Sequence, residues 1–227
     1  MNTEGLILPD WPAPENVMAM VSTRENAAEA FLQQQPAQFL QQVHGARVFR
    51  LDNVIEEQVE ADAIYTQSSG LTCVVRTADC LPVFFSSADG RELALAHAGW
   101  RGLAAGVLEN TLANCKTSLA EILVWLGPAI AACHFEVGPE VREIFLLHSD
   151  PADSGQTEAA FLRGKREGKW QADLYALARI RLLRAGINAA NIHGGGLCTY
   201  CDAQRFYSYR RDGEGQGRLL SLLWRRD

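Results

Sequence analysis

The chain has 227 residues, of which 48% are hydrophobic and 21% charged, and its formal net charge is -6 at pH 7. This length is enough to bury a substantial core without disulfides, and we expect residues 1–227 to form a single domain. The negative net charge argues against a protein that binds nucleic acid or an acidic membrane surface.

The N-terminal segment MNTEGLILPDWPAPENV has no cationic stretch leading into a long apolar run, so it does not resemble a secretory signal. No segment approaches the roughly 20 apolar residues that span a membrane. We therefore expect a cytoplasmic protein that does not bind membranes. Its six cysteines are then expected to be reduced thiols or metal ligands.

The first half of the chain predicts mainly strands. Residues 28–35 are helix-like as far as Pro36. Residues 71–77 and 81–87 are rich in β-branched and aromatic side chains, which favours strands, and residues 93–99 form another strand after an Asp-Gly turn.

The second half mixes helices with strands. The spacing of apolar residues predicts a helix over 102–115, a strand over 121–130 and a helix over 172–187 that ends near Gly186. Residues 148–171 are the most polar and form an excursion from the core, whereas residues 218–224 could close the sheet. Since helices and strands do not alternate regularly, we predict an α+β fold with mixed β-sheets packed together and flanked by helices.

Three potential metal ligands lie at the ends of predicted strands. His44 precedes a strand, Cys80 lies at a junction between two strands, and His97 is near the end of the next one. Two imidazoles and one thiolate form a three-ligand set with a fourth position open for water or substrate. Zinc suits this set, and copper is also possible.

The segments QQVHGARV, EADAIYTQ, RTADCLPVFF, AHAGWRG, LGPAIAACHFEVGPEV and GGLCTYCDAQRFYSYRRDG occur in this order. In this respect the chain resembles the laccase-domain family of the YfiH type, whose members are called peptidoglycan editing factor, polyphenol oxidase or purine nucleoside phosphorylase. The resemblance implies that His44, Cys80 and His97 bind one metal, usually zinc. It also implies packed β-sheets with helices outside, a fold shared with a bacterial cytotoxic factor that uses a Cys-His pair.

Other candidate residues have both functional and structural interpretations. Asp62 could orient a ligand histidine or contact substrate, giving it a catalytic role beside Cys80 and His97, or it could cap a turn. Arg24, Arg210 and Arg211 could bind phosphate, or form ordinary surface charges. Arg101 could contact an anion of the substrate, or form a structural ion pair. The segment VSTRENAAEAF lacks glycines common in the family, so one wall of the pocket is expected to differ.

The segment CTYC has the CxxC spacing of zinc and redox motifs. The sequence shows no second such pair, and His193 fits poorly as a ligand because it precedes Cys198 by five residues. The sequence-based expectation is therefore that Cys198 and Cys201 bind no metal.

Three activities are compatible with these observations. The resemblance favours a zinc enzyme acting on purine nucleosides (adenosine, inosine or methylthioadenosine) as a phosphorylase using phosphate or as a deaminase. An alternative is a peptidoglycan editing factor, an amidase acting on cytoplasmic muropeptide precursors, with Cys80 as nucleophile and His97 as base or with zinc assistance. A copper-dependent polyphenol oxidase is the third, although a full laccase needs a histidine-rich cluster and this chain has five histidines. A purely structural zinc module would normally have four protein ligands.

Overall fold

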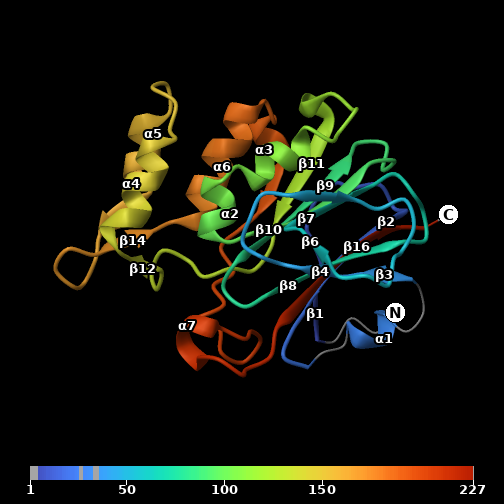
Figure 1. The fold of residues 1–227 in the computed structure, drawn as a ribbon, viewed down its shortest axis with the longest axis horizontal. Helices are drawn as coiled ribbons and strands as arrows, with labels where there is room; N and C mark the ends of the chain where they lie inside the picture. The colour runs from blue at the N-terminus through green and yellow to red at the C-terminus, as the bar shows by residue number, and fades with distance from the viewer. Residues whose placement is uncertain (1–4, 26–27, 33–35, 227) are drawn as a thin grey trace.

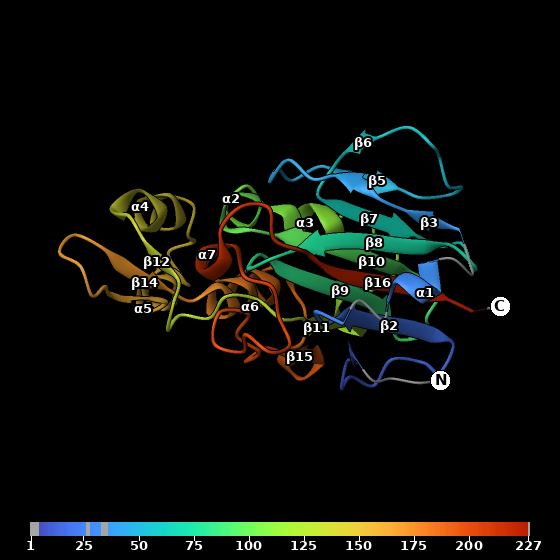
Figure 2. The ribbon, with the colours of Figure 1, turned by 90° about the horizontal axis from the view of Figure 1, so that it is seen from below.

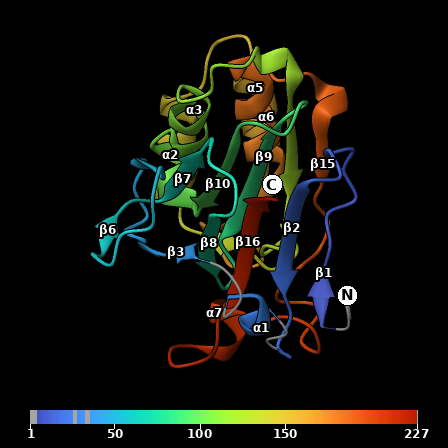
Figure 3. The same cartoon turned by 90° about the vertical axis from the view of Figure 1, so that its right-hand side faces the viewer.

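The computed structural model describes residues 5–25, 28–32 and 36–226. Two sheets pack face to face, with helices covering the outer face of one of them (Figures 1 and 3). The helix-covered sheet has the spatial order β15-β11-β9-β10-β7-β5 and consists of β5 (Val48–Arg50), β7 (Ala63–Thr66), β9 (Leu81–Ser87), β10 (Leu93–Ala98), β11 (Ile122–Leu126) and β15 (Ile192–Gly194). The second sheet has the order β1-β2-β16-β8-β3 and consists of β1 (Leu6–Ile7), β2 (Val17–Ser22), β3 (Ala37–Gln38), β8 (Thr72–Thr77) and β16 (Leu219–Arg225).

Both sheets are mixed. Strands β9, β10 and β11 pair antiparallel, whereas β5 with β7, β11 with β15 and β3 with β8 pair parallel. The α+β fold with mixed sheets and outer helices is therefore confirmed. The sequence leads us to expect that residues 218–224 complete the sheet, and Leu219–Arg225 do form the strand β16, which lies in the middle of its sheet between β2 and β8 and not at an edge.

The central strands are buried on both faces. On β9, Val83 and Phe85 belong to the core beneath the helices, while Phe84 between them packs into the core between the two sheets. On β10, Ala94 and Leu95 divide between the same two cores. Successive strand side chains point to opposite faces, so a strand with apolar residues at every position becomes the layer shared by both cores.

The outer helices are α2 (Trp100–Ala104), α3 (Val107–Leu112) and α6 (Leu174–Ala185). The predicted helix over 102–115 is in fact two helices, because Gly106 has φ 90°, a left-handed conformation that interrupts the hydrogen-bonded turns. The prediction for 172–187 is confirmed, and the helix ends before Gly186. The helix predicted over 28–35 is α1 (Glu29–Leu32), and residues 33–35 lie outside the described residues.

A small lobe extends from one end of the molecule (Figure 2). It contains α4 (Pro139–Leu147), α5 (Ser154–Ala159) and a sheet of β12 (Glu136–Val137), β13 (Phe161–Arg163) and β14 (Trp170–Ala172). Residues 148–171, the polar segment expected to extend from the core, therefore contain a helix and two strands. The remaining elements are β4 (Leu40–Gln41), β6 (Val59–Glu60), α7 (Tyr209–Asp212) and the short 3₁₀ turns η1 (Leu119–Glu121) and η2 (Ala189–Asn191). Within the described residues, no helix combines the length and apolar character needed to cross a membrane.

A buried carboxylate fastens the start of β10 to its neighbours. Glu92 accepts hydrogen bonds from the Tyr65 hydroxyl at 2.5 Å and from the backbone N–H groups of Lys116 at 2.9 Å and Thr117 at 2.7 Å. Burial would raise the pKa of Glu92, but these hydrogen bonds hold it below its usual value. The carboxylate therefore joins β7, β10 and the segment after α3.

We expect Glu92→Gln to lower the free energy of unfolding by about 1–3 kcal/mol, because its amide N–H group would face the backbone N–H donors. Thermal unfolding should show a Tm lower by about 2–10 °C. Glu121→Gln is the control, since Glu121 is exposed and lies in η1. An unchanged Tm for Glu92→Gln would contradict the assigned role.

Candidate metal centre

His44, Cys80 and His97 converge at one end of the helix-covered sheet. The pairing of Leu81 with Ala98 brings the start of β9 to the end of β10, and so brings Cys80 beside His97. The Cys80 Sγ atom lies 3.8 Å from His44 Nε2, and the two imidazole rings meet edge-on with centroids 4.8 Å apart. One potential ligand atom from each of the three residues lies within 4.8 Å of the others.

Asp62 fixes both histidine segments from beneath. Its fully buried carboxylate accepts hydrogen bonds from the backbone N–H of His44 at 2.9 Å and of Gly45 at 2.6 Å, and contacts His97 Nδ1 at 2.8 Å. Burial would raise the pKa of Asp62, but its hydrogen bonds to His97 and Gly45 lower it. Asp62 therefore caps the turn at His44, and its contact with Nδ1 leaves Nε2 as the ring nitrogen of His97 that could bind a metal.

Two residues beside the centre have unusual backbone conformations. Among the described residues other than glycine, positive φ angles occur at His44 (59°) and Asp79 (85°). Such conformations cost about 1–3 kcal/mol each and persist where surrounding contacts enforce them. Asp62 supplies those contacts at His44. At Asp79, the carboxylate accepts hydrogen bonds from the Thr199 hydroxyl at 2.6 Å and from the backbone N–H of Arg210 at 2.7 Å.

The glycine after the His97 strand leaves room for the ligands. A Cβ atom on Gly99 would lie 2.9 Å from Cys80 Sγ and 3.1 Å from His44 Cδ2. Its φ of -65° is accessible to any residue, so the requirement is for space and not for backbone freedom. This close approach explains the first glycine, Gly99, of the segment AHAGWRG.

The charges of the three side chains favour cation binding once His97 has lost its proton. Burial would raise the pKa of the Cys80 thiol, but hydrogen bonds and positive charge from His44 and His97 lower it to about 6. Burial would lower the pKa of His97, but hydrogen bonds to Asp62 and Cys80 raise it to about 9. Without a metal, the centre at neutral pH thus holds a thiolate and a protonated His97.

These donors fit zinc. A thiolate and two imidazole nitrogens are zinc ligands, three protein ligands are typical of a catalytic site, and a carboxylate behind one histidine is a common supporting contact. Among the described residues, the other three histidines, His134, His148 and His193, lie outside this cluster. The structure therefore offers one three-ligand centre here and does not surround it with further imidazoles.

A cavity of about 900 Å³ opens onto the centre. Its positively charged wall includes Arg76, Arg101, Arg210 and Arg218, and its apolar surface includes Trp100, Ile130, Phe135 and Tyr209. Among the described residues, no hydrogen bond or ion pair engages the exposed Arg101 guanidinium, which lies over the Trp100 ring with its central carbon 4.4 Å from the centroid. Arg210 Nη1 donates to the carbonyl oxygen of Glu136 at 2.9 Å.

Arg24 lies elsewhere. Its Nη1 donates to the carbonyl oxygens of Ala203 at 3.0 Å and Phe206 at 3.5 Å, and it forms an ion pair with Asp212 at 3.7 Å. It is not among the residues that line the cavity.

Sequence reasoning missed two of the cavity arginines. Arg76 could have been found because it begins the segment RTADC that contains Cys80. Arg218 follows a polar turn and has no comparable local signal. The loop after α7 brings it to the cavity.

A family profile described as multi-copper polyphenol oxidoreductase laccase matches residues 13–226. The chain belongs to this family. Members similar to it include purine nucleoside phosphorylase PA4543 of Pseudomonas aeruginosa, 41% identical over an alignment of 248 positions that covers 97% of this chain and 98% of the relative. Purine nucleoside phosphorylase YfiH of Escherichia coli is 41% identical over an alignment of 249 positions, which covers 96% of this chain and 98% of the relative.

Solved structures share the fold of this chain. The crystal structure of Neisseria meningitidis protein NMB0706 has 37% identity and a TM-score of 0.89, covering 99% of this chain and 100% of that one. YlmD of Geobacillus stearothermophilus has the same fold, with 24% identity and a TM-score of 0.89 over 100% of this chain and 98% of that one. The predicted resemblance to the laccase-domain family of the YfiH type is confirmed.

We expect Asp62→Asn to weaken zinc binding at the centre by about 10–100-fold, because the anion behind His97 is lost and the amide faces backbone donors. Competition with a chelator measures the affinity. Asp52→Asn is the control, since Asp52 is exposed and contacts Arg50 at 3.2 Å. Equal zinc affinities for Asp62→Asn and the wild-type protein would show that Asp62 does not support the ligands.

Zinc affinity should rise with pH. Between about 6 and about 9, the pKa values of Cys80 and His97, zinc must displace the His97 proton, so affinity should increase about tenfold per pH unit. Below about 6 the Cys80 thiol must also lose its proton, which makes the slope steeper. Calorimetry in buffers of different ionisation enthalpy counts the released protons, with Cys80→Ser as the reference. A zinc affinity that does not change with pH across this range would contradict the pairing of a Cys80 thiolate with a protonated His97 in the metal-free centre.

Proposed function

We propose that the chain is a zinc-dependent enzyme that cleaves purine nucleosides with phosphate. Inosine, adenosine and methylthioadenosine are the proposed substrates. The observation that carries this proposal is the cavity itself, which joins a three-ligand metal centre to an arginine-rich wall and an aromatic surface. The names of relatives that match nearly the whole chain support the same reaction.

The cavity has a suitable size and chemistry for both reactants. Its volume of about 900 Å³ lies within the range of small-molecule sites. Phe135 and Tyr209 offer apolar ring surface for a purine, while Arg101 and Arg218 offer fixed positive charge for phosphate. Guanidinium groups can bind two phosphate oxygens at once, so they orient phosphate as well as attract it.

In phosphorolysis, a phosphate oxygen forms a bond to C1′ of the ribose as the bond from C1′ to the purine nitrogen breaks. The bonding electrons pass to the base, which takes up a proton, and the products are the free base and the sugar 1-phosphate, which is ribose 1-phosphate from inosine or adenosine and 5-methylthioribose 1-phosphate from methylthioadenosine. The arginines bind and orient the phosphate, and the aromatic surface holds the base at a fixed distance from it. A zinc ion held by His44, Cys80 and His97 would withdraw electron density from the substrate atom that it contacts.

Zinc and not copper is proposed as the metal, although the family description names copper. A multicopper oxidase needs several imidazoles around its copper cluster, and the three remaining histidines lie outside this centre. Adenosine deamination by water is a second reaction proposed for the same site, because the cavity would present the purine to the same metal. Hydrolysis of a muropeptide precursor, with Cys80 as nucleophile, remains an alternative for the experiment to compare.

The zinc-loaded protein should convert inosine to hypoxanthine and ribose 1-phosphate only when phosphate is present, without added copper or oxygen. Arg101→Ala should raise the KM for phosphate about 10–100-fold, because a charge-assisted contact of about 1.5–3 kcal/mol is lost. Chromatography of the products and initial rates at varied phosphate measure both effects.

Arg91→Ala is the matched control, because Arg91 is exposed, pairs with Asp89 at 3.6 Å and does not line the cavity. Equal cleavage of inosine without phosphate would refute phosphorolysis. Activity toward phenols alone, restored only by copper, would identify an oxidase. Cleavage of a muropeptide precursor without nucleoside turnover would identify an amidase.

A further inference from the structure

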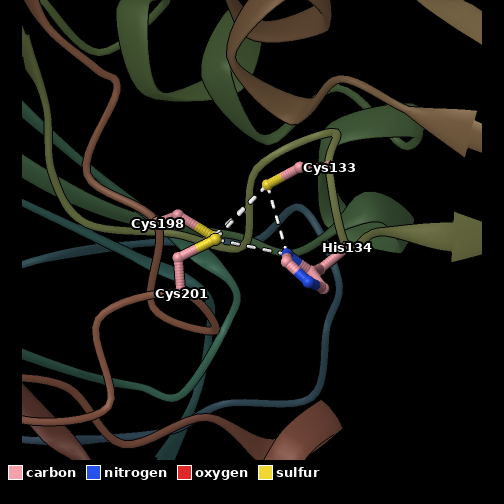
Figure 4. Close-up of side chains that lie close together, drawn as sticks. All are labelled: Cys133, His134, Cys198 and Cys201. Carbon is pink, nitrogen blue, oxygen red and sulfur yellow. Dashed lines mark hydrogen bonds between the residues drawn. The ribbon is translucent and has the colours of Figure 1, made fainter.

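A second cluster of potential metal ligands lies outside the cavity. It consists of Cys133, His134, Cys198 and Cys201, and one potential ligand atom from each lies within 4.8 Å of the others. Figure 4 shows the four side chains pointing toward one another from two separate loops. Cys133 and His134, which are distant from the CxxC pair in the sequence, thus lie beside it in the structure.

The parallel pairing of β11 with β15 explains this convergence. Parallel strands end at the same edge of a sheet. Residues 127–135 follow β11, residues 195–208 follow β15, and Ala129 and Cys198 form a β-bridge between the two loops. Ligands that are far apart in the sequence therefore meet at this edge.

The distances match tetrahedral coordination. Cys133 Sγ lies 3.9 Å from Cys198 Sγ and 3.5 Å from Cys201 Sγ, and His134 Nδ1 lies 3.2 Å from the sulfur atoms of Cys133 and Cys201. Tetrahedral zinc with Zn–S of about 2.3 Å and Zn–N of about 2.0 Å needs S···S separations of about 3.8 Å and S···N separations of about 3.5 Å. A disulfide needs about 2.05 Å, so none of these sulfur pairs is bonded.

The surrounding residues hold the ligands in place. The His134 ring stacks on Tyr200, with centroids 4.0 Å apart and planes at 15°. The backbone N–H of Ala131 points at Cys198 Sγ at 3.5 Å, and Arg211 Nη1 donates to the carbonyl oxygens of Thr199 at 2.8 Å and Tyr200 at 2.7 Å. Contacts of this kind fix ligand orientation around structural metals.

We propose that Cys133, His134, Cys198 and Cys201 bind a second zinc ion in a closed, structural site. Three thiolates and one imidazole complete a tetrahedron, so no position is left open for substrate. The ion would join the loop after β11 to the loop after β15. The first of these loops carries Phe135 into the cavity, and the second leads to Arg210. The proposal revises the sequence-based expectation that the CxxC pair binds no metal, and it does not depend on the reaction proposed above.

The test is the metal content of full-length protein purified with a reductant and zinc. Elemental analysis should find about two zinc ions per chain in the wild-type protein and about one in Cys80→Ser, Cys133→Ser and Cys201→Ser. Cys80→Ser combined with Cys133→Ser should contain almost none. Cys115→Ser is the matched control, because Cys115 belongs to neither cluster, and it should keep both ions.

Cobalt gives a readout that is independent of activity. Cys80→Ser loaded with Co²⁺ alone should show thiolate-to-cobalt charge transfer and the intense visible bands of tetrahedral cobalt. Adding Cys201→Ser should reduce the charge transfer and weaken cobalt binding at least tenfold. If a serine variant does not fold, a mercurial reagent added to wild-type protein with a zinc-sensitive dye still counts the ions, and release of two supports the proposal.

A single zinc ion in the wild-type protein, lost in Cys80→Ser and unchanged in Cys133→Ser and Cys201→Ser, would overturn the proposal. A disulfide between Cys133 and Cys201 under the same reducing, zinc-containing conditions would also overturn it. Mass spectrometry detects this disulfide as the loss of two hydrogen atoms.

Discussion

The buried carboxylate of Asp62 is the contact on which the metal centre depends. It lies between the turn that carries His44 and the strand that carries His97, and it accepts hydrogen bonds from the backbone of the first and contacts the imidazole of the second. The buried Asp62 charge thereby stabilises the strained backbone at His44. By contacting Nδ1 of His97, it also leaves Nε2 as the nitrogen that faces the candidate metal position. The cost of burying that charge is offset because the surrounding donors are already in place.

A second carboxylate performs a similar task on the other side of Cys80. Asp79 has a left-handed backbone, and its side chain accepts hydrogen bonds from Thr199 and from the N–H of Arg210. Asp79, which directly precedes Cys80, therefore also fixes the loop after β15 that brings Arg210 to the cavity. The candidate metal centre and the arginine-rich wall of the cavity are joined through short polar contacts, so their geometries depend on each other.

The second cysteine cluster contacts that wall through Arg210, whose Nη1 donates to the carbonyl oxygen of His134 at 3.4 Å. Arg210 donates to the carbonyl oxygen of Glu136, close to His134, and the Arg210 guanidinium lies over the Phe135 ring at 5.5 Å. A metal ion binding the two loops would restrict the positions of both cavity residues without contacting substrate. Such a cross-link would add to the packing of Val141, Phe145 and Phe161, through which the small lobe shares the core beneath the helices.

The sequence by itself determined the strands around Cys80 and His97 and the α+β class, and it pointed to His44, Cys80 and His97 as candidate ligands, because apolar patterns and the family segments are local. It did not reveal that residues 102–115 form two helices, since the effect of Gly106 depends on its backbone angle. Arg24 and Arg218 could not be assigned to the cavity or excluded from it, because loop paths decide their positions. The meeting of Cys133 and His134 with the CxxC pair was decided only by the tertiary structure, through the parallel pairing of two strands that are distant in the chain.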